Sequence, residues 1–270
     1  MSHYKKSESY QRDKINSAAR NNKFTTLVIP EIDDACDKAL EFVERGDIKR
    51  GQKMLLALSK EHPDYHTVLY GMGVCYCLQG RIQKAIPCFK RAVEIFPLLT
   101  AAHYNLGASY CRNVDIENAV KSFENVIELD GEDGEYGAMA KQRLDDLDRI
   151  SREAHGIGLH DCIKNQQVFS RAFDALRRRE FQSAIHLFNQ VLRVDENHVQ
   201  SYGNLGLAYA GIGDKKRAIE CFDKALALDP DYKPAAINRL ALEEAGDCKS
   251  LFEKTQIHEV DYYRDSEMNE

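Results

Sequence analysis

Four residues near the middle of the chain are of types that bind zinc. His155, His160, Asp161 and Cys162 supply imidazole, carboxylate and thiol groups within one short segment. Structural zinc sites bring their ligands in two spaced pairs, whereas His160 and Cys162 are near neighbours and no second pair accompanies them. We therefore interpret the segment as a polar linker with a buried cysteine, and we expect no metal ion.

Two further stretches have residues of the kinds that contact phosphate. Gly156-Ile157-Gly158 precedes a predicted helix, but a phosphate-binding loop also has a preceding strand and more glycines. Arg177-Arg178-Arg179 is a basic run at the end of a predicted helix, where positive charge complements the helix dipole. We interpret the first stretch as a hinge and the second as a solvated helix end.

The sequence has no pattern of a nucleophile beside a general base. Serines such as Ser109, Ser170 and Ser201 fall on predicted helix faces and lack the sharp turn that presents a catalytic serine. No stretch resembles a nucleotide, flavin or pyridoxal site. We therefore predict that the protein is not an enzyme and uses no cofactor.

The composition of the chain narrows its partners and its compartment. A net charge of −6 argues against general binding of nucleic acid, which needs a surplus of Lys and Arg facing the phosphates. The eight cysteines are scattered without a disulfide framework, as in reducing compartments. The sequence shows neither a signal peptide nor an apolar stretch of membrane-spanning length. We expect no nucleic-acid partner, no membrane span and a cytoplasmic protein.

The spacing of residues over 199–232 predicts a hairpin of two helices. Gly213 can end the first helix in the left-handed conformation, Asp214 can cap the second, and Pro230 stops it. Each helix has one face of regularly spaced residues: Tyr202, Leu205 and Tyr209 on the first, and Ala218, Phe222 and Ala225 on the second. Small residues, including Gly206, mark a tight crossing of the helices. One hairpin cannot bury both of its sides, so it must stack on copies of itself.

Copies occur with the same length. The ranges 66–99 and 100–133 repeat the scheme, and 32–65 and 165–198 repeat it more weakly. Five windows that follow one template resemble the tetratricopeptide repeat (TPR) family, whose repeats have this period. The resemblance implies an all-α solenoid, a right-handed superhelix of antiparallel helix pairs.

The register of the repeats fails once, so we predict two sub-arrays. Residues 134–164 do not match the template, but an apolar stripe with a charged remainder predicts a capping helix there. The expected parts are a basic polar leader over 1–31, repeats one to three over 32–133, a capping helix and hinge over 134–164, repeats four and five over 165–232, a C-terminal capping helix over 233–246 and an acidic polar tail over 247–270.

The resemblance also implies where a partner would bind. In TPR arrays the first helix of each hairpin lines a concave groove. Mapped onto this chain, the expected groove residues are Tyr70, Tyr104, Asn105, Arg112, Phe169, Phe173, Asn204 and Asn238. Their aromatic members would favour an apolar or helical segment.

Asn105, Asn204 and Asn238 share one position in the repeat. A side-chain amide both donates and accepts, so it can pair with the backbone of an extended peptide. Peptide-binding members of the family use an asparagine at this place in that way. The alternative is that the asparagine is simply a common polar residue of the repeat beside the tight crossing, and the sequence leaves both readings open.

The resemblance argues against an adaptor for chaperone tails. Such domains hold a C-terminal carboxylate with Lys, Asn and Arg on their groove helices. The corresponding positions hold Cys36, Leu40, Gly71, Ala101 and Asn105 in the first sub-array, and Phe169, Phe173, Asn204, Pro234 and Asn238 in the second. Only Asn204 fits that pattern.

Two function classes remain. The first is a non-catalytic interaction module or scaffold that binds a peptide or helical segment of a protein partner in the concave groove. The second is a structural protein that forms a homo-oligomer through its array ends or capping helices.

Overall fold

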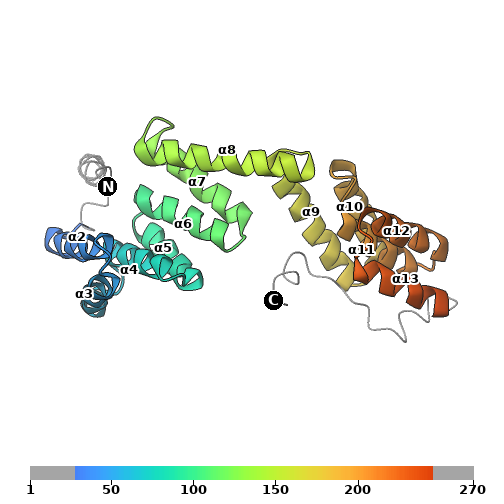
Figure 1. Cartoon of the computed structure of the whole chain (residues 1–270), viewed down its shortest axis with the longest axis horizontal. Helices are drawn as coiled ribbons and strands as arrows, with labels where there is room; N and C mark the ends of the chain where they lie inside the picture. The colour runs from blue at the N-terminus through green and yellow to red at the C-terminus, as the bar shows by residue number, and fades with distance from the viewer. Residues whose placement is uncertain (1–27, 246–270) are drawn as a thin grey trace. The chain divides into compact units, whose positions relative to one another are not determined.

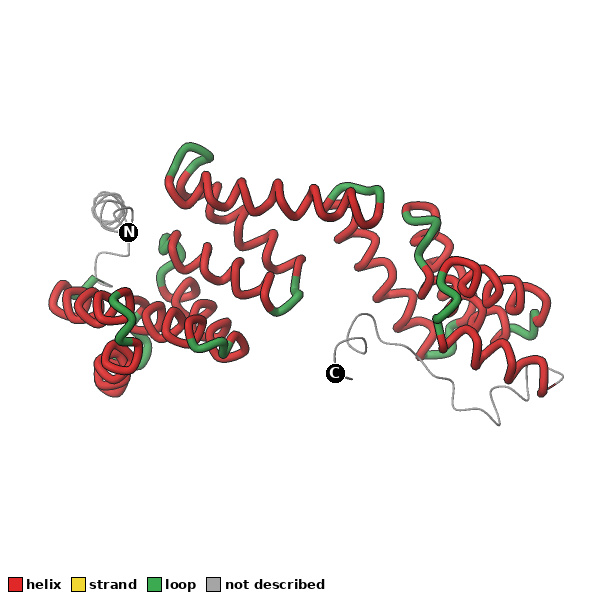
Figure 2. The backbone as a smooth tube through the Cα atoms, viewed as in Figure 1, coloured by secondary structure: helices red, strands yellow, loops and turns green. Residues whose placement is uncertain are grey.

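The computed structural model describes residues 28–245, which contain helices and connecting loops and no strand (Figure 2). The helices are α2 (Pro30–Glu44), α3 (Ile48–Glu61), α4 (His66–Leu78), α5 (Ile82–Ile95), α6 (Thr100–Arg112), α7 (Ile116–Asp130), α8 (Glu135–His155), α9 (Leu159–Arg177), α10 (Phe181–Val194), α11 (Val199–Gly211), α12 (Lys215–Leu228) and α13 (Lys233–Ala245) (Figure 1). The predicted leader and tail lie outside these residues, apart from the last few residues of the leader. There Pro30 begins α2, because proline suits the first turn of a helix.

The chain is an all-α solenoid of antiparallel helix pairs, as predicted. The pairs are α2–α3, α4–α5, α6–α7, α9–α10 and α11–α12, and in each pair the two helices pack on each other. We call α2, α4, α6, α9 and α11 the first helices and their mates the second helices. Within each unit, each second helix also packs on the first helix that follows it, and α12 packs on α13.

The chain divides into two compact units inside α8, between Asp146 and Leu147. The first unit holds three helix pairs and the second holds two pairs followed by α13. The domain limits derived from the sequence remain a proposal.

A glycine–phenylalanine crossing joins the two helices in three of the pairs. A Cβ atom added to Gly73 would lie 2.6 Å from the ring of Phe89, and one added to Gly206 would lie 2.6 Å from the ring of Phe222. At Gly107 the added atom would lie 2.8 Å from the ring of Phe123. All three rings are fully buried. The small residues therefore set how closely the helices approach, as the spacing predicts.

The turn between the two helices of each pair carries one residue with positive φ. The residues are Gly46 (89°), Gly80 (73°), Val114 (58°), Arg179 (59°) and Gly213 (86°). All five occupy the same place in their repeats, so the backbone repeats even where the glycine does not. Valine is strained in this region because its branched Cβ crowds the backbone.

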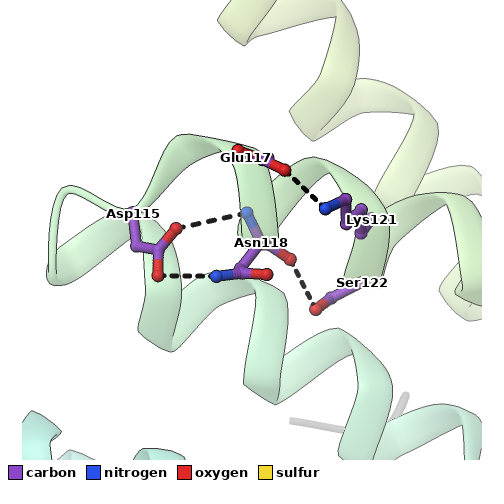
Figure 3. A network of polar contacts seen from close by, with 5 residues as sticks. All are labelled: Asp115, Glu117, Asn118, Lys121 and Ser122. Carbon is purple, nitrogen blue, oxygen red and sulfur yellow. Dashed lines mark hydrogen bonds and ion pairs between the residues drawn. The ribbon is translucent and has the colours of Figure 1, made fainter. Parts of the chain in front are cut away.

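Aspartates cap several of the second helices. Asp115 precedes α7, and its carboxylate accepts hydrogen bonds from the backbone N–H of Asn118 at 3.3 Å and from the Asn118 side chain at 2.8 Å (Figure 3). One turn on, Lys121 pairs with Glu117 and Ser122 donates to the Asn118 carbonyl. Asp47 and Asp214 cap α3 and α12 in the same way.

A histidine caps α11. The Nδ1 atom of His198 accepts a hydrogen bond from the Ser201 backbone N–H at 3.2 Å, and its ring centroid lies 5.0 Å from that of Phe169. Burial lowers the pKa of His198 to about 4; the Asp195 carboxylate opposes this shift and the His155 ring adds to it. Because a protonated Nδ1 cannot accept a hydrogen bond, this cap needs the neutral ring.

The substitution Val114→Gly should stabilise the first unit by about 1 kcal/mol. Glycine adopts a positive φ without steric cost, and Val114 is 69% exposed, so little packing is lost. Urea unfolding measures the change. The matched control is Gly80→Val, which places valine in the equivalent turn and should be destabilising. A loss of stability in Val114→Gly would contradict this account of the turn.

The stability of the second unit should fall as the pH is lowered from about 6.5 to about 4. The unfolded chain takes up a proton on His198 near pH 6.5, whereas the folded chain takes it up only near pH 4. The contribution of His198 to the stability is therefore complete above pH 6.5 and is lost progressively as the pH falls toward about 4. The difference corresponds to about 3 kcal/mol.

Urea unfolding at several pH values across this range tests the prediction. The control is His198→Asn, which keeps an acceptor at the cap but does not titrate. Its free energy of unfolding should depend less on pH in this window. An equal dependence in both proteins would show that His198 is not responsible.

Candidate partner-binding surface

The first helices form the inner layer of each unit. Neighbouring first helices pack on each other, as α2 does on α4, α4 on α6 and α9 on α11. Among the described helices, the second helices of adjacent pairs make no comparable contact. A stack of helix pairs curves toward the side on which neighbouring helices lie closer together. The first helices therefore line the inner, concave face of each unit.

Asn105 lies on this inner face and is held in place by its neighbours. Its Nδ2 donates to the Ala101 carbonyl at 2.9 Å and to the Tyr70 hydroxyl at 3.3 Å. Both amide hydrogens are therefore engaged within the protein, whereas Oδ1 accepts no hydrogen bond from the described residues. The amide oxygen is thus the part of Asn105 that is left to accept a hydrogen bond from a partner.

Arg112 lies two turns further along α6 and is exposed. One of its guanidinium nitrogens, Nη1, donates to the Cys77 carbonyl of α4 at 3.2 Å. This bond ties the end of α6 to the end of α4 and leaves the other guanidinium N–H groups for an acceptor from outside.

The four aromatic residues of the expected groove are all at least nine-tenths buried. The ring of Tyr70 packs on Phe89, and that of Tyr104 packs on Phe123 and Tyr136. In the first unit these rings fill the space between their own first helix and the helices packed on it.

The second unit shows the same arrangement. Phe169 stacks on Phe173 with a centroid separation of 6.4 Å, and it meets Phe188 edge to face at 5.7 Å. Phe169 belongs to the hydrophobic core of this unit. These two phenylalanines thus contribute to stability, and they offer little surface to a partner.

Asn204 and Asn238 are also buried, with 3% and 2% of their surfaces exposed. Among the described residues, the Nδ2 of Asn204 has no hydrogen-bond partner, and neither has the hydroxyl of Ser201 one turn before it on α11. A buried donor without an acceptor costs about 1–3 kcal/mol. Such a group in a folded protein calls for an explanation, and an acceptor from a bound partner would provide one.

Five of the described thiols are poorly suited to act as nucleophiles. Burial raises the pKa of Cys36 and Cys75 to about 11 and that of Cys221 to about 12. Burial also raises the pKa values of Cys88 and Cys111. These thiols stay protonated near neutral pH, and the thiolate is the reactive form.

The four residues singled out as potential zinc ligands are not brought together as a site. His155 lies 3.9 Å from the Asp195 carboxylate of the α10 end. Over residues 28–245, no three side chains of His, Cys, Asp or Glu are placed so that they could hold a metal ion. A membrane-spanning helix is also absent from this part of the chain.

Sequence comparison matches the tetratricopeptide repeat family model at residues 66–97 and 199–232. The yeast (Saccharomyces cerevisiae) mitochondrial import receptor subunit TOM70 is 35% identical over 93 residues, which is 34% of this chain and 14% of that protein. Superkiller protein 3 of the same organism is 40% identical over 57 residues, 21% of this chain and 4% of that protein. The matched stretch is thus a small part of these relatives.

Among solved structures, the yeast Sti1 TPR2AB domain in complex with pHSP90 aligns with a TM-score of 0.39 and 14% identity, covering 82% of this chain and 88% of that one. The P58(IPK) TPR domain aligns with a TM-score of 0.40 and 16% identity, covering 84% and 62%. The family model thus identifies tetratricopeptide repeats at residues 66–97 and 199–232, within a chain whose five helix pairs follow one 34-residue plan.

Proposed function

We propose that the protein is a non-catalytic interaction module that binds a segment of another protein on the inner face of its repeats. The observation that carries this proposal is the hydrogen bonding of the Asn105 side chain. Two donated hydrogen bonds fix its amide, and its oxygen remains as an acceptor on a partly exposed residue. A fixed acceptor suits the backbone N–H of a bound peptide, because little conformational entropy is lost on binding.

Arg112 provides the second contact on the same helix. It lies seven residues after Asn105, a rise of about 10 Å along α6. A peptide lying along this helix would place an N–H at Asn105 and a carbonyl or carboxylate at Arg112. In the second unit, the unpaired amide of Asn204 would donate to a partner carbonyl after a small movement of the side chain.

A sequence relative, the cysteines and the net charge support the proposed role, compartment and type of partner. TOM70, which is similar over a third of this chain, is an import receptor subunit, and a receptor works by binding. The described cysteines are free and several are buried, which suits a reducing, cytoplasmic environment. The net charge of −6 favours a protein or peptide partner over nucleic acid.

A second candidate function is self-association through the end of the second unit. On α13, Ile237 and Leu240 are 44% and 55% exposed, and α13 lacks a paired second helix among the described residues. Two copies could bury these side chains against each other. Light scattering of the wild type and of Leu240→Glu, over a range of concentrations, tests this function. If both proteins keep the mass of a single chain at every concentration, self-association is excluded.

The double substitution Asn105→Ala, Arg112→Ala should abolish capture of partners from a native lysate. Removing one fixed acceptor and one cation should weaken binding by at least about tenfold for a partner measured by calorimetry. The control is Asn125→Ala, an exposed asparagine on the second helix α7. If the double variant, at equal thermal stability, captures the same partners as the wild type, the inner face of the first unit is not the binding surface.

A further inference from the structure

The second unit has a surface pocket that does not belong to the inner face. It lies between α10 and α11 and has a volume of about 510 Å³. Its lining residues are Gln182, Ile185, His186, Asn189, Leu192, Arg193, Tyr202 and Leu205. The volume is in the range of sites that hold a few side chains or a small ligand.

The position of the pocket follows from the helix geometry. Six of the lining residues come from α10, a second helix, and two come from α11. Tyr202 and Leu205 are one turn apart on α11, so they share a face, and that face differs from the one that carries Asn204. The pocket therefore opens where α10 meets the side of α11, separate from the surface proposed above.

The pocket combines an apolar base with a polar rim that includes one cation, Arg193. Leu205 is buried in the core, and Ile185, Leu192 and Tyr202 pack against that core. Gln182, His186 and Arg193 are exposed at the edge. None of the eight lining residues is acidic.

Arg193 is the one arginine or lysine among the eight lining residues. It makes no ion pair or hydrogen bond with any described residue. Six other arginines have a carboxylate partner: Arg45, Arg91, Arg149, Arg152, Arg217 and Arg239. A cation without a partner, in a chain with more acidic than basic residues, is available to a carboxylate from outside.

The same place in the first unit has different chemistry. At the repeat position of Arg193, the α5 helix has Glu94, which pairs with Arg91 at 3.3 Å. Pro87 stands where α10 has His186, and Lys90 stands where α10 has Asn189. The α3 helix has Lys60 at the position of Arg193 and Lys53 at that of His186, so the charge at this place varies from repeat to repeat.

We propose that the pocket between α10 and α11 binds an acidic segment of a partner protein. A leucine, phenylalanine or tyrosine of that segment enters the pocket and contacts Ile185, Leu192 and Tyr202. A neighbouring aspartate or glutamate pairs with Arg193. Apolar burial supplies most of the affinity, and the ion pair selects acidic partners and rejects basic ones.

An array of immobilised ten-residue peptides tests the proposal with the full chain. Each peptide carries Leu, Phe or Tyr flanked by acidic, basic or serine residues. The wild-type protein should retain acidic peptides, and the dissociation constant of a retained peptide, from fluorescence anisotropy, should rise with salt. Arg193→Glu should weaken this binding at least tenfold and should create binding of the basic peptides.

The matched control is Arg171→Glu, which makes the same change of charge at an exposed arginine of α9 outside the pocket. Equal retention of acidic and basic peptides would overturn the proposal, as would an equal loss in the Arg193 and Arg171 variants. A many-fold gain in affinity for the acidic peptides on deletion of residues 249–270 would also overturn the proposal, because the chain's own acidic end would then be the occupant of the pocket. Asn105→Ala should leave this binding unchanged, which separates the two sites.

Discussion

The close approach of glycine and phenylalanine inside the helix pairs is the constraint on which the array depends. At Gly73, Gly107 and Gly206 the ring of the partner helix occupies the space where a Cβ atom would lie. The ring in turn is fully buried. The distance between the two helices is thereby fixed, and with it the surface that each pair presents to the next.

Much of the fold could be predicted from the sequence because these crossings leave a direct trace in it. Glycine, alanine and phenylalanine must recur at fixed places for the helices to pack, so their spacing identifies the pairs. The turn was less visible in two repeats. Val114 and Arg179 adopt the positive φ that glycine adopts elsewhere, and only the surrounding structure imposes that conformation on them.

The contacts of the candidate binding residues could not be predicted from the sequence, for a physical reason. Their exposure depends on neighbours far away in the sequence. Asn105 uses its donors on Tyr70, 35 residues earlier, and Phe169 packs on Phe188 of the following helix. A repeat template gives the face on which a side chain lies, but it does not give the contacts that the side chain makes there. The pocket beside Arg193 arises from residues of two helices, and no single stretch marks it.

The packing of the helix pairs has a consequence for how the chain loses its structure. Within each unit, each described helix pair packs mainly on the pairs next to it, so the ends of the stack are held by fewer contacts. The terminal pairs therefore open more often than those between them, and amide protons should exchange fastest there. In the first unit the pair α4–α5 has a neighbour on both sides and is the last to open. A ligand that spans two pairs raises the cooperativity of the whole unit, since it adds a contact that the stack itself lacks.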